Sequence, residues 1–139
     1  MRHSMLSAVL FGAVTLAASS LAVAQSRPDY GKIEYQSNCA VCHGETGEGG
    51  GPYVSFINKT PPDLTTLSKR NGGVFPIQRV YEIIDGQGVE IQAHGPRDMP
   101  IWGAEYASKA GEHLAYYPEV FARTRILVLV DYLYRMQKK

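Results

Sequence analysis

The feature that most constrains this chain is the pentapeptide Cys39-Ala40-Val41-Cys42-His43, which holds both of its cysteines. A C-x-x-C-H pattern is typical of covalent attachment of a c-type haem. Two intervening residues place the sulfurs at the separation of the two vinyl-derived carbons of one porphyrin, and the adjacent histidine directs its ring toward the iron. A haem attached in this way cannot dissociate. The motif therefore predicts a domain folded around a permanent cofactor, bound through Cys39 and Cys42.

Other interpretations of the two cysteines fit the sequence less well. A redox-active pair of the thioredoxin type would lie in a βαβ pattern, which this sequence does not show. A zinc site needs four ligands, and no second cysteine pair follows; His94 and His113 lie far apart in the sequence. A structural disulfide between Cys39 and Cys42 is the simplest alternative, because two free cysteines beside a histidine are a liability in an oxidising compartment. We prefer the haem interpretation.

Residues 1–24 have the layout of a secretory signal peptide. Arg2 gives a short positive start, an uncharged run follows over residues 5–21, and Ala22-Val23-Ala24 forms a small-residue cleavage site. An uncleaved membrane anchor is the alternative, since a spanning helix needs about 18 or more apolar residues. Several hydroxyl side chains within the run, and the cleavage site itself, favour export. We expect residues 25–139 to form one mature domain in the periplasm, without stable membrane insertion.

Composition limits the possible partners. The chain has 14 Lys and Arg against 13 Asp and Glu, and loss of Arg2 with the leader makes the mature chain formally neutral. A nucleic-acid binder would show a basic surplus, so nucleic acid is not expected as a partner. The 45% hydrophobic content is enough for a packed core.

Three segments are predicted to be helices, which makes the chain mainly α. The first covers about residues 29–38 with Asp29 as its N-cap, and the second runs from Ile77 to a stop at Gly86 with apolar residues at helical spacing. The third follows Pro118 to about Met136, although its aliphatic middle would also suit a buried strand. Two long irregular stretches, 44–60 and 86–103, are expected to wrap around something, because loops of this length are usually functional.

The chain resembles the small monohaem c-type cytochromes of bacteria. The resemblance rests on the haem motif, which begins at Cys39, and on five further positions: Gly31 and Tyr35 before it, and Leu129, Tyr132 and Leu133 on the last helix. It implies the cytochrome c fold, in which the terminal helices cross and loops wrap around one covalently bound haem. A glycine at the crossing lets two backbones approach closely, which gives Gly31 a packing role.

The resemblance also implies axial ligands for the iron, namely His43 and a methionine. Met99 precedes Pro100 in a pair similar to the family's Met-Pro ligand loop, whereas Met136 lies among charged residues where an interior position is not expected. A thioether ligand raises the reduction potential relative to a second imidazole. His94, five residues before Met99, is the alternative ligand; we expect it to face solvent or a haem propionate.

Supporting residues are implied as well. A ligating histidine normally donates its second ring N–H to a carbonyl. In the family a Gly-Pro pair supplies that carbonyl, which matches Gly51-Pro52, with Pro61-Pro62 as the alternative. Asp63 is expected to cap a short helix, and Trp102 to belong to the haem wall or the core.

With His43 and Met99 both bound, the iron has no open position for a substrate. The expected function is therefore single-electron transfer between a donor dehydrogenase or reductase and an acceptor such as an oxidase, not catalysis. A dedicated cytochrome subunit of a periplasmic dehydrogenase is the alternative, and a small haem peroxidase or gas-binding cytochrome is less favoured. Residues 104–117 are either a partner-specific surface or a loop without a role. Val41 and Ile101 are expected on an apolar rim around an exposed haem edge.

Overall fold

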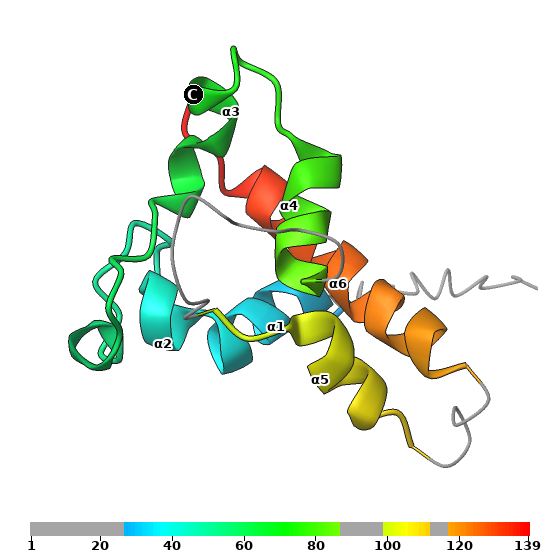
Figure 1. Cartoon of the computed structure of the whole chain (residues 1–139). Helices are drawn as coiled ribbons and strands as arrows, with labels where there is room; N and C mark the ends of the chain where they lie inside the picture. Colours follow the sequence, from blue (N-terminus) through cyan, green and yellow to red (C-terminus); the bar gives the residue numbers. More distant parts are fainter. Residues whose placement is uncertain (1–26, 87–98, 112–116) are drawn as a thin grey trace, which may run out of the picture.

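The computed structural model describes residues 27–86, 99–111 and 117–139, and every regular element in these ranges is a helix (Figure 1). The predicted leader, His94 and His113 lie outside the described residues. In chain order the elements are α1 (Tyr30–Asn38), α2 (Ala40–His43), η1 (Val54–Phe56), η2 (Leu64–Thr66), α3 (Leu67–Arg70), α4 (Ile77–Asp85), α5 (Trp102–Ser108) and α6 (Pro118–Arg135).

The three predicted helices are confirmed, with the expected ends. The Asp29 side chain accepts the Lys32 N–H at 3.0 Å and so caps α1. Gly86 ends α4 in the left-handed conformation, with φ of 79°, and Pro118 occupies the first turn of α6. The aliphatic middle of α6 is helical because its residues alternate between core and solvent with helical, not strand, spacing.

Helix α5 was not predicted from the sequence. Residues 104–108 belong to a helix, not to a loop, and Gly103 and Tyr106 are buried in it. The segment has only seven residues and no side-chain cap, so it carries no strong local helix signal. Its stability comes from packing against α6 and α4. The part of 104–117 that lies in α5 therefore serves the core.

Helix α6 is the centre of the packing, since α1, α4 and α5 all lie against it (Figure 1). The core is formed by Tyr35 of α1, Phe75 just before α4, Val80 and Ile84 of α4, Tyr106 of α5, and Ala122, Ile126, Leu129, Val130 and Leu133 of α6. No helix in the three described ranges is both long and apolar enough to cross a bilayer.

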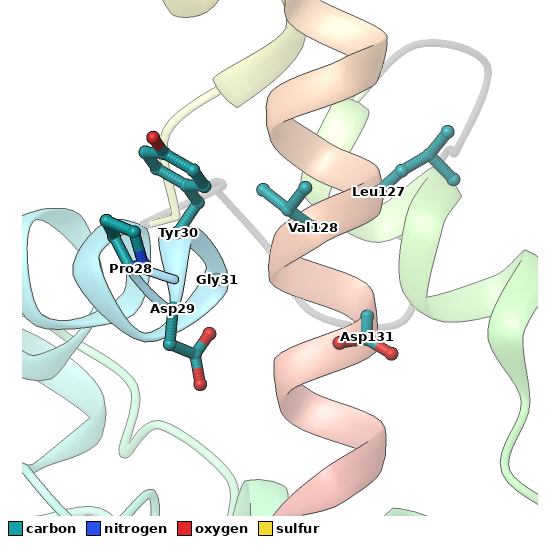
Figure 2. Close-up of a pocket in the computed structure, with 7 residues that line it drawn as sticks. All are labelled: Pro28, Asp29, Tyr30, Gly31, Leu127, Val128 and Asp131. Carbon is teal, nitrogen blue, oxygen red and sulfur yellow. The ribbon is translucent and has the colours of Figure 1, made fainter. Parts of the chain in front are cut away.

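The terminal helices cross at Gly31, as the resemblance implied. A Cβ atom at Gly31 would lie 2.2 Å from the Val128 carbonyl oxygen and 2.7 Å from Cβ of Tyr132, so only glycine fits. Figure 2 shows Gly31 facing α6, with Val128 and Asp131 on the opposite side of a shallow groove. Arg135 near the end of α6 donates two hydrogen bonds of 2.8 Å to the Asp29 carboxylate and fastens the start of α1.

Substitution Gly31→Ala should lower the free energy of unfolding by about 1–3 kcal/mol, because the added methyl group meets backbone that cannot move away cheaply. Denaturant unfolding of the holoprotein measures the loss. Gly111→Ala is the matched control, since a Cβ at that position meets nothing within 4 Å. Equal stabilities of the two variants would mean that the helices do not cross at Gly31.

Candidate haem-attachment site

The C-x-x-C-H motif lies at the carboxyl end of α1 and continues directly into α2. The Cys39 N–H donates to the Tyr35 carbonyl at 2.8 Å, which completes α1, and the His43 N–H donates to the Cys39 carbonyl at 2.8 Å. The two sulfurs and the imidazole are thus presented by one helical turn. Both cysteines are free thiols and are partly buried, so the disulfide alternative is not formed.

The Cys39 thiol is turned toward the protein interior. Burial raises its pKa to about 12, and the nearby Glu34 carboxylate and Cys42 act in the same direction. A redox-active or nucleophilic cysteine needs the opposite, namely a lowered pKa that favours the thiolate. The environment of Cys39 therefore does not suit disulfide exchange or nucleophilic catalysis, and its sulfur packs against the core.

The His43 imidazole is partly buried, with its Nδ1 atom shielded from solvent, and the Pro62 carbonyl is the polar group that acts on it. Burial lowers the pKa of His43, whereas the Pro62 backbone carbonyl raises it. Within the described residues, Nδ1 is buried without a hydrogen bond of standard geometry, and the Pro62 carbonyl is its candidate acceptor. A histidine held at Nδ1 by a carbonyl can offer its other nitrogen to a metal.

Of the two pairs expected to supply this carbonyl, Pro61-Pro62 is the one that lies near the imidazole, since Pro62 acts on His43 and Gly51-Pro52 does not. Gly51 has a different role, because it packs directly on the backbone of the motif. A Cβ at Gly51 would lie 2.4 Å from the Val41 carbonyl oxygen, and the Gly51 N–H donates to the Cys42 carbonyl at 3.2 Å. This close approach holds the chain around Gly51 against the backbone of α2. Gly51 therefore supports the motif's backbone, whereas Pro62 acts on the imidazole.

Tyr35 holds the residue that follows the histidine. Its buried hydroxyl donates to the Gly44 carbonyl at 2.6 Å, and burial raises the pKa of the phenol. Its ring lies 5.4 Å from that of Tyr132 on α6, centroid to centroid. The resemblance identified Tyr35, but the hydrogen bond to Gly44 was not foreseen. Tyr35 thus connects the helix crossing to the end of α2.

The two methionines of the described chain lie in different surroundings. Met99 is partly buried just before α5 and packs against the core cluster that Cys39 and Trp102 also contact. Met136 is partly buried too, so the expectation that it avoids the interior is wrong. A Cβ atom on Gly47 would lie 2.7 Å from the Met136 methyl group. Met136 therefore packs against the loop that follows His43.

A partly buried charge cluster beside Cys39 was not predicted from the sequence. Glu34 of α1 is only 7% exposed; its carboxylate forms an ion pair with Arg125 of α6 and accepts the Asn38 amide at 3.1 Å. The Arg125 guanidinium lies 5.0 Å over the ring of Tyr106 in α5, and the neighbouring Glu34 carboxylate adds to the effect of burial in raising the pKa of that phenol. Three helices therefore meet at one carboxylate. Nothing in the local sequence pattern marks these residues, because they are distant in the chain.

Helices packed around a partly buried C-x-x-C-H turn are the arrangement of a haem-attaching domain. The comparisons agree: the model of the cytochrome c family matches residues 29–112, and the chain belongs to that family. Membership implies a covalently bound haem c. The free cysteines, the buried His43 Nδ1 and the core-facing Cys39 fit that group.

A relative supports the same family. The chain is 38% identical over 68 residues to cytochrome c-555 of Methylococcus capsulatus (strain Bath). The matched region covers 49% of this chain and 52% of that protein. The chain thus matches about half the length of this curated relative. No solved structure matches.

Replacing Arg125 with methionine should lower the free energy of unfolding by about 2–4 kcal/mol, because Glu34 then remains buried without its charge partner. The double variant Glu34→Gln with Arg125→Met should recover part of this loss. Arg123→Met is the matched control, since Arg123 lies two residues before Arg125 on the same helix and is exposed. Denaturant unfolding of the three variants checks the expectation, and an Arg125→Met loss no larger than that of Arg123→Met would contradict it.

Proposed function

We propose that this protein is a periplasmic single-electron carrier with one haem c, bound through Cys39 and Cys42 and ligated by His43 and Met99. The observation that carries the proposal is the single turn that presents two free, partly buried cysteines and a partly buried imidazole, with Cys39 packed against the core. Bound haem supplies the redox chemistry by changing between ferric and ferrous iron.

The residues around the motif have distinct roles in this proposal. Cys39 and Cys42 form the thioether links, and His43 binds the iron from the same turn. The Pro62 carbonyl fixes the imidazole by accepting its Nδ1–H, which also makes the ring a stronger donor. Tyr35 keeps the chain after His43 in place through Gly44.

Met99 is the proposed second axial ligand. It is partly buried just before α5 and packs against the same core as Cys39. Met136 also packs against this core, but its methyl group lies next to Gly47 in the loop after His43. Two protein ligands leave the iron without an open position, which favours electron transfer over catalysis. A thioether ligand stabilises the ferrous state relative to a second imidazole.

The leader-like residues 1–24 support the periplasmic location, with residues 25–139 as the mature domain. Donor and acceptor proteins would then meet the carrier in brief encounters. Val41, between the cysteines, is 45% exposed and Ile101, two residues after Met99, is 43% exposed. These side chains support an apolar docking rim next to the haem, of the small size typical of transient redox contacts.

Ferric protein should show the weak red charge-transfer band of thioether-ligated haem iron, and Met99→Ala should abolish it. Met136→Ala is the matched control and should keep the band, because Met136 packs against the loop near Gly47. An unchanged spectrum in Met99→Ala, together with an altered spectrum in His94→Ala, would contradict ligation by Met99 and indicate that His94 is the second ligand.

The electron-transfer rate with the physiological partner should change less than about threefold between about 10 and 300 mM salt, over which the Debye length shortens roughly fivefold. The physical reason is the charge balance of the proposed mature chain, in which 13 basic residues, after loss of Arg2, face 13 acidic ones and give little summed field for steering. Stopped-flow kinetics measure the rate, with Val41→Ser as a variant that should slow it at every salt concentration. A tenfold fall with salt would contradict the apolar rim and indicate a clustered charge patch.

A further inference from the structure

The residues after α6 fold over the segment that follows the haem motif. We name Met136, Gln137 and Lys138 the C-terminal clamp. The Lys138 N–H donates to the Thr65 carbonyl at 2.8 Å, and its ammonium group forms an ion pair with Glu48. Met136 packs near Gly47. The clamp therefore touches both ends of the loop between α2 and α3.

Gln137 makes the densest set of hydrogen bonds in the clamp. Its amide nitrogen donates to the carbonyls of Leu64 and Leu133, each at 2.7 Å, and its amide oxygen accepts the Ser68 N–H at 2.9 Å. Both donors and the acceptor of one side chain are thus used on backbone groups. They join the end of α6 to η2 and to α3.

The segment held by Gln137 leads directly to the imidazole. Leu64 lies two residues after Pro62, whose carbonyl acts on His43. The Leu64 N–H also donates to the Gly47 carbonyl at 2.7 Å, and the Gly49 N–H donates to the His43 carbonyl at 2.8 Å. The position of Leu64 is therefore transmitted to His43 along two routes, one through Pro62 and one through the glycine-rich loop.

Besides the clamp, the segment is held by the side chains of Leu64 and Leu67, which pack against the core, and by the Leu64 N–H bond to Gly47. Its regular structure consists of η2, with three residues, and α3, with four, and elements this short do not hold themselves in place. The Asp63 carboxylate caps the Thr65 N–H at 2.7 Å, but that contact is local. The contacts that tie the segment to the body of the protein include those of the clamp.

We propose that Gln137 is a positioning residue for the axial histidine: it holds Leu64 and so sets the Pro62 carbonyl against Nδ1 of His43. The inference deepens the proposed function, because it requires His43 to bind the iron. A carbonyl that accepts the Nδ1–H strengthens the imidazole as a donor and so favours ferric iron. Loosening that contact should shift the protein toward the ferrous state.

The test uses the holoprotein with Gln137→Met, which keeps the side-chain volume and removes the three hydrogen bonds. The ferrous-to-ferric ratio at a fixed ambient potential should rise at least threefold. Solvent exchange of the hyperfine-shifted Nδ1 proton of His43, followed by NMR, should accelerate at least tenfold. Lys138→Met is the matched control: it removes the exposed ion pair with Glu48 and a weaker attraction to Asp63, keeps the Lys138 N–H bond to Thr65, and should leave both readouts unchanged.

Gln137→Asn provides a milder variant should Gln137→Met not fold, and its changes should have the same direction and smaller size. A wild-type protein without a protected, hyperfine-shifted imidazole proton overturns the ligation by His43 and this inference together. A protected proton in the wild type that exchanges equally slowly in the Gln137 variants, with an unchanged redox ratio, overturns the positioning role alone.

Discussion

The close crossing of α1 and α6 at Gly31 is the contact on which the other parts of the structure depend. It allows two helices that are distant in the sequence to share one core, in which Tyr35 meets Tyr132. The carboxyl end of α1 then carries Cys39 and the haem motif, and the end of α6 carries the C-terminal clamp to the loop behind that motif (Figure 1). The close approach at Gly31 thus brings together the end of α1, which carries the haem motif, and the end of α6, which carries the clamp.

Polar side chains, not additional helices, fix the less regular parts around this core. Glu34 and Arg125 join α5 to the crossing helices, and Gln137 joins the segment after Pro62 to the end of α6. The Glu34–Arg125 ion pair and the Gln137 hydrogen bonds both use polar groups that are costly to bury unless they are paired. Each therefore favours one relative position of the segments that it joins.

The sequence predicts those features whose physical cause is local. The motif has a fixed spacing, Asp29 and Gly86 end helices by their own backbone preferences, and the period of α4 is visible in its apolar residues. Helix α5, the Glu34–Arg125 pair, the burial of Met136 and the choice of Pro62 over Gly51-Pro52 depend on contacts between distant segments, which no local pattern records. The family match ends at residue 112, before α6, so the crossing itself rests on the structure and on the pattern of Leu129, Tyr132 and Leu133.

The central claim is that one haem is covalently attached at Cys39 and Cys42 within a mature chain of residues 25–139. The most direct measurement is the intact mass of the purified holoprotein before and after extraction with acidic acetone. The account predicts one mass, equal to residues 25–139 plus one haem, and no change on extraction. A mass that falls to that of the bare polypeptide after extraction would contradict covalent attachment and the function built on it.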